Sequence, residues 1–335
     1  MHERSVAAPA NEQAKRLREK LERELGDTIV AGLAAPNVVE IMLNADGILW
    51  LDVLGEGMCD TGVRMSAMQA ENLLRTIASA LDLVVNADHP ILEGVLPFDG
   101  SRFAGVLPPV SNRPVFAIRK RAGLIFTLDD YVKTGVCDAR SAEVIRDAVA
   151  QRQNILIVGS TGSGKTTLAN AVLNEISVQH HEQRIVIIED TVELQCAAPN
   201  HVALKTSETT DMTRLLRTTM RLRPDRIVVG EVRGSEALAL LKAWNTGHPG
   251  GLATVHANSA VAGLVRLEQL IQEANVPPQP QLIAEAVDLL VSIVRTPTGR
   301  RIAEIVRVDG YSAAGGYDVK TLVSKVVRLE PVIAA

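Results

Sequence analysis

The stretch that decides the fold lies in the middle of the chain and reads Ile155-Leu-Ile-Val-Gly-Ser-Thr-Gly-Ser-Gly-Lys-Thr-Thr-Leu-Ala-Asn170. Residues 159–166 match the pattern GxxxxGK[ST] in full. Four apolar residues precede the pattern as a strand, and a segment rich in Ala and Leu follows it as a helix, which is the context that a phosphate-binding loop requires. The sequence therefore predicts a phosphate loop between a buried strand and a helix.

Each residue type in this loop has a chemical reason to be there. Glycines let successive backbone N–H groups turn inward around a triphosphate, and the N-terminus of the following helix adds a positive dipole end. The Lys165 ammonium suits the β- and γ-phosphates, and the Thr166 hydroxyl suits Mg²⁺. A dinucleotide site is not favoured, because the GxGxxG pattern is absent here. We expect ATP and Mg²⁺ to be bound by Gly159, Ser160, Thr161, Gly162, Ser163, Gly164, Lys165, Thr166 and Thr167.

The expected pattern of helices and strands differs between the two parts of the chain. From Asn154 onward, strands and helices alternate, which predicts a mostly parallel α/β sheet with crossover helices over residues 131–335. Residues 1–122 are instead typical of a smaller α+β domain, and residues 123–130 are expected to link the two. Strands in the second domain are also expected at residues 291–295, 301–308 and 321–328.

The first domain has its own local signals. Apolar residues around the turn at residues 44–47 predict a hairpin of strands 38–43 and 48–53. A helix is expected over residues 66–85 with Ser66 as its N-cap, followed by strands at 101–106 and 114–120. Within a charged arm, residues 1–25, leucines recur every fourth residue, which predicts a solvated helix that rests one stripe on the body. A subunit contact or a membrane-surface helix remains a further interpretation of this arm.

Composition excludes several classes of protein. Hydrophobic residues make up 47% and charged residues 22% of the 335-residue chain, so it is not wholly disordered. A net charge of −4 and 3% aromatic residues disfavour a general DNA-coating or base-stacking protein. The three cysteines are far apart and the seven histidines lack metal-ligand spacing, so neither a disulfide framework nor a zinc site is expected. The longest uncharged stretch, residues 243–265, is too polar to span a membrane.

Acidic side chains follow two apolar strands in the second domain. Glu189 and Asp190 follow residues 185–188, and Glu231 comes one residue after Gly230 at the end of another apolar run. Carboxylates at the carboxyl ends of parallel strands suit Mg²⁺ and the attacking water of a triphosphatase. Glu189 or Glu231 could instead cap a helix. For Glu193 the sequence does not decide between a role in the site and a structural role.

Basic residues and a histidine complete the candidate set. Arg214, Arg217 and Arg221 fall at i, i+3 and i+7, so one helix face carries three guanidinium groups. This face could be a solvated stripe, a phosphate-neutralising group or a contact across a subunit boundary. His256 ends a short strand at the same edge of the sheet, where it could sense the γ-phosphate or serve a structural role.

The order of four elements along the chain resembles that of the secretion-superfamily ATPases. These elements are the 159–166 loop, the Glu189/Asp190 box, the Gly230–Glu231 strand end and the His256 box. These ATPases are the hexameric motors of type IV secretion, type II secretion and type IV pili, and the likeness covers nearly all of residues 100–310. The segment 215–260 is similar to the conjugal-transfer ATPases of the type IV secretion branch. The resemblance implies a RecA-like P-loop domain, ATP and Mg²⁺ as ligands, and a homo-hexamer.

The resemblance also implies a role for individual residues. Lys165 and Thr166 would bind phosphate and Mg²⁺, Glu189 would activate water, and Glu231 would complete the metal and water shell. His256 would monitor the γ-phosphate, and Arg217 and Arg221 would reach the nucleotide. In the first domain, Arg102 and Arg119 match the arginines that close over the nucleotide, although the sequence alone would class them as ordinary strand residues.

The same likeness implies a cytoplasmic ATPase, peripherally associated with the inner membrane, whose partners are inner-membrane channel proteins of a type IV secretion or conjugation system. It would power conjugative pilus assembly and plasmid DNA transfer, without direct sequence-specific nucleic-acid binding. A pilus-retraction or type II secretion motor is the alternative. The chain lacks the four-cysteine insert of the type II and pilus-assembly motors, and residues 282–290 lack the late motif of the retraction motors. A DNA-translocating ATPase and a nucleotide-binding regulator without turnover are the other classes considered.

Overall fold

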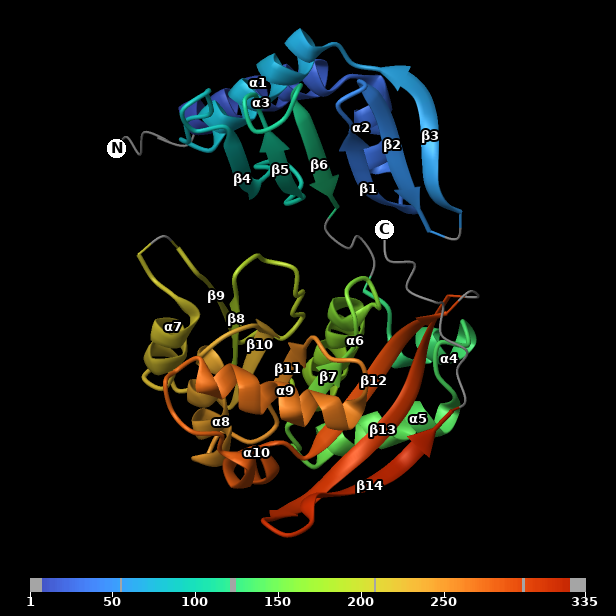
Figure 1. The fold of residues 1–335 in the computed structure, drawn as a ribbon, viewed down its shortest axis with the longest axis vertical. Coiled ribbons are helices and arrows are strands. Elements are labelled where there is room, and N and C mark those ends of the chain that lie inside the picture. Colours follow the sequence, from blue (N-terminus) through green and yellow to red (C-terminus); the bar gives the residue numbers. More distant parts are fainter. Residues whose placement is uncertain (1–7, 55, 121–124, 208, 297–298, 326–335) are drawn as a thin grey trace, which may run out of the picture. The chain divides into compact units, whose positions relative to one another are not determined.

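The computed structural model describes residues 8–54, 56–120, 125–207, 209–296 and 299–325. These residues divide into two compact units, Met1–Leu124 and Ile125–Ala335, which are drawn in Figure 1. Each unit has a sheet and a hydrophobic core of its own, and each is described by itself below.

The N-terminal unit is an antiparallel sheet with helices packed on it. Its six strands are ordered β3-β2-β1-β6-β5-β4, and every neighbouring pair is antiparallel. In Figure 1, α1 and α3 lie together at one side of this sheet. The elements are α1 (Ala8–Leu25), α2 (Asp27–Ala34), β1 (Val38–Leu43), β2 (Ile48–Val53), β3 (Gly57–Arg64), α3 (Ala67–Ala80), β4 (Ile91–Val95), β5 (Arg102–Val106) and β6 (Val115–Arg119).

Local sequence signals explain much of this unit. Gly47 has a φ of 82° in the turn of the predicted hairpin, a conformation that glycine adopts without steric cost. Ser66 caps α3 through a reciprocal capping box with Gln69. On α1, the side chains of Leu21 and Leu25 are fully buried in the core of this unit, so the predicted apolar stripe rests on the body.

The C-terminal unit is built on a mostly parallel eight-stranded sheet. Its strand order is β14-β13-β12-β7-β11-β10-β8-β9, with β12 to β9 parallel and the β12–β13–β14 edge antiparallel. The elements are α4 (Leu128–Lys133), α5 (Ala139–Ala150), β7 (Ile155–Val158), α6 (Lys165–Gln179), β8 (Ile185–Glu189), β9 (His201–Lys205), α7 (Met212–Thr219), β10 (Arg226–Val232), α8 (Glu236–Asn245), β11 (Leu252–Val255), α9 (Ala260–Gln272), α10 (Pro280–Ala286), β12 (Leu289–Thr296), β13 (Gly299–Ser312) and β14 (Gly316–Ser324).

Helices cover both faces of this sheet, so its central strands are buried on both sides. Alternate residues of β7 enter different cores: Leu156 and Val158 pack with α7, α8 and α9, whereas Ile155 and Ile157 pack with α5 and α6. Each such side chain contributes about 1.5–3 kcal/mol through burial. The fold is therefore the predicted α/β class, preceded by the smaller α+β unit.

Several predicted boundaries are corrected by the structure. The expected linker 123–130 already contains the start of α4 at Leu128, because Thr127 caps that helix in a capping box with Asp130. The helix predicted to run to residue 85 ends at Ala80, since Asp82 takes a left-handed φ of 55°. The last predicted strand begins earlier, as β14, and its predicted residues 326–328 lie outside the described residues.

A fully buried arginine connects several chain segments at the edge of the C-terminal sheet that lies opposite the phosphate loop. Arg226 begins β10, and its guanidinium donates to Gln183 Oε1 at 2.6 Å, Gly250 O at 2.9 Å and Val149 O at 3.1 Å. Burial lowers the pKa of Arg226 to about 10, so the side chain still carries its charge at neutral pH. One side chain therefore satisfies acceptors from the end of α5, the start of β8 and the start of β11.

We expect Arg226→Met to lower the free energy of unfolding by about 3 kcal/mol or more, because it leaves three buried acceptors without a donor. Urea denaturation measures the change. Arg140→Met, at an exposed position on α5, is the control and should stay within about 0.5 kcal/mol of the parent. A loss below about 1 kcal/mol in Arg226→Met would show that water replaces the guanidinium at these acceptors.

Candidate functional site

The phosphate loop connects β7 to α6 as the sequence predicts. Gly162 and Gly164 have φ values of 70° and 99°, and Gly164 is the N-cap of α6. Gly159 has no room for a side chain, because a methyl group there would lie 2.4 Å from the carbonyl oxygen of Ile293. Glycines at these positions therefore permit the tight turn that aims backbone N–H groups into the loop.

Four strand ends bring the predicted site residues to one edge of the sheet. Strands β7, β11, β10 and β8 are adjacent and parallel, with Val158 opposite Val255 and Val229 opposite Ile188. Their carboxyl ends deliver, in spatial order, the phosphate loop, His256, Glu231 and Glu189. This is the edge at which open α/β sheets bind ligands. The structure thus assembles residues that are nearly 100 positions apart in the chain.

A continuous chain of polar contacts runs along this edge. Lys165 is 7% exposed, and its Nζ donates to Ser160 O at 3.1 Å and lies 3.1 Å from His256 Nδ1. His256 Nε2 lies 2.5 Å from Glu231 Oε1, and Arg233 Nε donates to Glu231 Oε2 at 2.5 Å. An ammonium can only donate and a carboxylate can only accept, so these partners favour the imidazole tautomer with its proton on Nε2.

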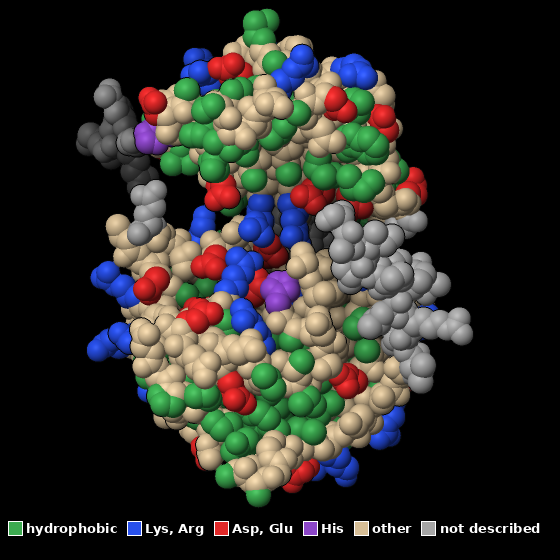
Figure 2. All heavy atoms as spheres, in the orientation of Figure 1, with side chains coloured by type: hydrophobic (Ala, Val, Ile, Leu, Met, Phe, Trp, Pro, Cys, Tyr) green, Lys and Arg blue, Asp and Glu red, His purple; other side chains and the backbone are tan. Residues whose placement is uncertain are grey.

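The protonation state of His256 follows from its surroundings. Burial lowers the pKa of this imidazole below its usual value, the Glu231 carboxylate opposes that shift, and the charges of Lys165 and Arg233 add to it. The ring is therefore neutral at pH 7. Figure 2 shows basic and acidic side chains and a histidine close together on the visible face of the C-terminal unit.

Glu189 is buried, and one of its carboxylate oxygens makes structural hydrogen bonds. Its side chain is 4% exposed, and Oε1 accepts hydrogen bonds from the backbone N–H groups of Glu193 and Leu194, both at 2.9 Å. Gly230 on the adjacent strand lies against it, so that a methyl group there would be 2.9 Å from Glu189 Cγ. The carboxylate thus caps no helix and instead holds the loop after β8 by its backbone, and Gly230 makes room for it.

The acidic residues around this centre differ in what they contact. Asp190 Oδ1 accepts from Thr206 Oγ1 at 3.1 Å, and Oδ2 lies 3.9 Å from Arg233 Nη1. Glu193 is placed by its backbone, because Asn170 Nδ2 donates to its carbonyl oxygen. Arg233 was not predicted from the sequence as a site residue. It directly follows the last residue of β10, Val232, and no motif marks it.

The residues present fit a nucleotide with its Mg²⁺. The Ser163 hydroxyl is buried within the loop and has no hydrogen-bond partner among the described residues. Thr166 lies in the first turn of α6, beside Lys165. Among the described residues no three His, Cys, Asp or Glu side chains form a metal-binding cluster.

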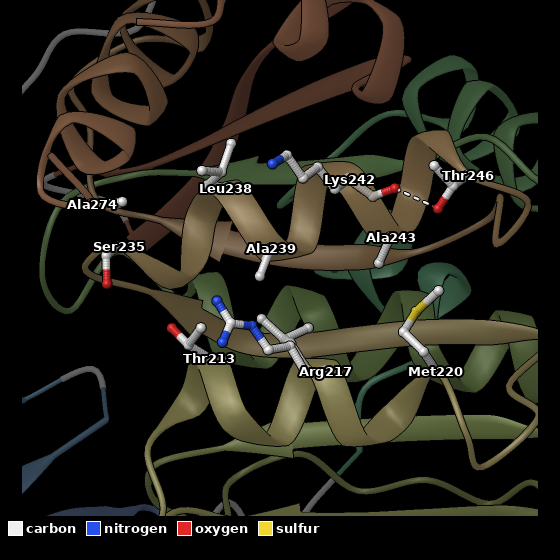
Figure 3. Close-up of a pocket in the computed structure, with 11 residues that line it drawn as sticks. Thr213, Arg217, Met220, Ser235, Leu238, Ala239, Lys242, Ala243, Thr246 and Ala274 are labelled. Atoms are coloured by element: carbon white, nitrogen blue, oxygen red, sulfur yellow. Dashed lines mark hydrogen bonds between the residues drawn. The ribbon is translucent and has the colours of Figure 1, made fainter. Parts of the chain in front are cut away.

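Arg214 and Arg217 lie on α7 and not at the phosphate loop, whereas Arg221 lies in the turn that follows, because α7 ends at Thr219. The predicted helix face with three arginines therefore carries only two. The α7 helix packs against β8, β9 and α8, and Arg214, Arg217 and Arg221 are exposed. Arg217 projects into a pocket of about 390 Å³ between α7 and α8, together with Met220, Leu238 and Lys242 (Figure 3). The described residues of this unit show no contact between the stripe and the phosphate loop. Its predicted contact with nucleotide stays a prediction.

The two N-terminal arginines lie side by side within their own unit. Arg102 on β5 and Arg119 on β6 are directly opposite each other in the antiparallel register. Like charges placed directly opposite destabilise a strand pair, so this pair favours the approach of an anion. Their contact with the nucleotide also stays a prediction.

None of the helices among the described residues is long and apolar enough to cross a membrane.

Comparison with known proteins identifies similar chains. Residues 58–330 match the family model described as "Type II/IV secretion system protein". The "Probable conjugal transfer protein TrbB" of Sinorhizobium fredii is 54% identical over 306 residues, which covers 91% of this chain and 94% of that protein. The "Conjugal transfer protein TrbB" of Rhizobium radiobacter is 51% identical over 296 residues, or 88% of this chain and 91% of that protein.

A solved structure supports the fold. The ATPase DotB of Yersinia pseudotuberculosis is 17% identical and has a TM-score of 0.60, over 86% of this chain and 79% of that one.

We expect a histidine-resolved NMR titration to give His256 a midpoint below 6.5, its usual value. Lys165→Met should raise the midpoint, because it removes a neighbouring positive charge. Between the folded and unfolded pKa values the folded chain binds fewer protons, so the free energy of unfolding falls as the pH falls through that interval. A midpoint above 6.5 would mean that the Glu231 carboxylate outweighs burial and both cations.

Proposed function

Because the chain belongs to the type II/IV secretion system protein family, we propose that it is an ATPase of a type IV secretion or conjugation system. The observation that carries this proposal is the joining of Lys165, His256 and Glu231 at the carboxyl ends of adjacent strands. The proposed work of the ATPase is conjugative pilus assembly and plasmid DNA transfer. Relatives that are 51–54% identical over about nine-tenths of the chain and are named as conjugal transfer proteins support it.

The phosphate loop would hold the triphosphate. Its inward backbone N–H groups and the N-terminus of α6 attract the phosphate oxygens, and Lys165 neutralises charge on the β- and γ-phosphates. The Lys165 ammonium lies only 3.1 Å from His256 Nδ1, so an anion that contacts the lysine comes within reach of the imidazole. The Nε2 proton of His256 faces Glu231 in this structure, so a γ-phosphate would be sensed by an exchange of that partner for a phosphate oxygen.

Hydrolysis needs a group that removes a proton from water. In the proposed reaction the Glu189 carboxylate accepts that proton, the water oxygen bonds to the γ-phosphorus, and the bond to the bridging oxygen of ADP breaks. Glu189 is buried against Gly230 of the neighbouring strand, and its Oε1 is held by two backbone N–H groups. Those bonds fix the carboxylate in one orientation, which is what a general base requires.

Thr166 and Glu231 are the residues that would hold Mg²⁺ together with the phosphates. The ion would stabilise the negative charge that develops on the transferred phosphoryl group. The Glu231 carboxylate lies between the His256 ring and the Arg233 guanidinium, and these contacts hold it at the end of β10. Release of either contact would free one oxygen for the metal or its water.

A homo-hexamer is the proposed assembly, since heterologous contacts between identical subunits close into rings. The exposed Arg217 on α7 and Arg221 in the turn after it would then serve a neighbouring subunit. Arg102 and Arg119 would close over the nucleotide from the N-terminal unit. We propose partners in the inner-membrane secretion channel and a cytoplasmic site with peripheral membrane association.

A pilus-retraction or type II secretion motor is the second candidate. It shares the type II/IV secretion family and would use the same phosphate loop and acidic residues. The high identity to conjugal transfer proteins favours the first candidate, and a functional assay separates the two.

We expect Glu189→Gln to lower kcat for ATP roughly 100-fold or more, because the amide can still accept the two backbone hydrogen bonds but cannot take a proton. Steady-state phosphate release measures kcat, and nucleotide affinity should change little. Glu143→Gln, at an exposed position on α5, is the surface control and should match the parent. An unchanged rate in Glu189→Gln would leave the carboxylate as a loop cap only and would support a binding protein without turnover.

We expect Lys165→Ala to abolish plasmid transfer from the source strain and to lower ATP turnover at least about 100-fold, since it removes the cation that neutralises the phosphates. Twitching motility is scored in the same cells and should stay normal. Lys133→Ala, on the exposed face of α4, is the control. Normal transfer with defective twitching would favour the pilus motor. Near-ultraviolet circular dichroism checks that the fold of the variant is retained.

A further inference from the structure

A second cation lies against the phosphate loop, on the side away from His256. Arg300, at the start of β13, donates from Nε to the carbonyl oxygen of Gly162 at 3.4 Å. A methyl group on Gly164 would lie 2.7 Å from Arg300 Cδ and 3.2 Å from its Nε. The side chain therefore covers the turn from Gly162 to Gly164, where the loop passes into α6. No local sequence pattern predicts this contact, because Arg300 lies about 135 residues after the phosphate loop.

The strand pairing explains why an arginine from the end of the chain reaches the loop. Strand β12 is the parallel neighbour of β7, with Ser292 opposite Val158, and it continues past the end of β7 beside the loop (Figure 1). The Ile293 carbonyl fills the space next to Gly159, and Ile293 Cδ1 lies 3.5 Å from the position of a methyl group on Gly164. Strand β13 returns antiparallel with Arg300 opposite Arg295, so its first residues lie next to the same loop.

The base of the hairpin is held in place. Thr296 Oγ1 donates to Gly299 O at 2.8 Å, which fixes the chain directly before Arg300. Arg300 is half-buried, and its positive charge opposes the effect of burial, which raises the pKa of the Tyr131 hydroxyl on α4. To the described residues, its guanidinium makes one hydrogen bond, from Nε. A guanidinium has five N–H donors, so the Nη edge retains donors for an anion.

We propose that Arg300 is a positioning residue for the nucleotide, which fixes the Gly162–Gly164 turn from outside and adds a cation at the α- and β-phosphate end of the loop. This inference rests on the proposed ATPase function. Lys165 is directed toward His256 and Ser160, the side of the γ-phosphate, so the two cations would flank the loop at opposite ends. Arg300 would thus act on the phosphates that ATP and ADP share, and it would not discriminate between them.

The proposal predicts a change in binding rather than in chemistry. We expect Arg300→Met, which keeps the aliphatic stem over Gly164, to raise the Kd of both ATP and ADP about tenfold, because a hydrogen-bonded charge is lost. The KM for ATP should rise by the same factor while kcat stays within about twofold. The dependence of the ADP Kd on salt concentration should also become shallower, since one cation near the phosphates is removed. Arg300→Lys should recover part of the affinity.

Arg301→Met is the matched control, because Arg301 is the next residue on the same strand and also donates to a backbone carbonyl at 3.4 Å, that of Gly135. It should leave Kd, KM and salt dependence unchanged. Isothermal titration of the full-length chain with ATP and ADP gives the affinities, and thermal unfolding confirms that each variant is folded.

Equal affinities in Arg300→Met and the parent would overturn the inference and leave the ATPase proposal intact. A fall in kcat at unchanged KM would also overturn it, because Arg300 would then act on the reaction. Absence of ATP and ADP binding by the parent chain would overturn the proposed function itself, together with the inference.

Discussion

The parallel pairing of β7 with its neighbours β11 and β12 is the constraint on which the site depends. Strand β7 contributes only four residues, all of them buried, and the phosphate loop begins as soon as it ends. Pairing with β11 places His256 beside the loop on one side, and pairing with β12 places Ile293 and Arg300 on the other. A one-residue slip in either register would turn these side chains to the opposite face of the sheet. The two cores that cover β7 make such a slip costly.

Charge along the strand ends is arranged in alternation. Cationic Lys165 contacts neutral His256, which contacts anionic Glu231, which pairs with cationic Arg233. Lys165 is buried, and His256 and Glu231 are half-buried, whereas Arg233 is exposed. An unpaired charge at the buried positions would cost free energy, and the contacts among these groups reduce that cost. The same groups are those that a triphosphate and its metal would engage. The site thus holds donors, acceptors and a general-base candidate in place through contacts that a ligand can exchange for its own.

Prediction from the sequence succeeded for features that a local sequence pattern determines. The phosphate loop, the α/β alternation, the Ser66 cap and the hairpin around Gly47 all depend on residues within a few positions of one another. Prediction was less accurate for elements whose structure depends on contacts with distant parts of the chain. The edge strands β3, β4 and β9 were not predicted, since pairing to a neighbouring strand defines them. The hydrogen bonds from the 193–194 backbone to Glu189 were also not predicted, because residues 190–195 form an irregular loop whose path the sequence pattern does not specify.

By itself the sequence determined the fold class, the phosphate loop and the types of side chain at the strand ends, because glycine conformations, apolar runs and capping residues act locally. Only the tertiary structure decided which of those side chains meet. It joined Lys165 to His256 and Glu231, added Arg233 and Arg300, and placed Arg217 between α7 and α8. The physical reason is that strand order and register bring together residues that are far apart in the chain, and no short stretch of sequence specifies them.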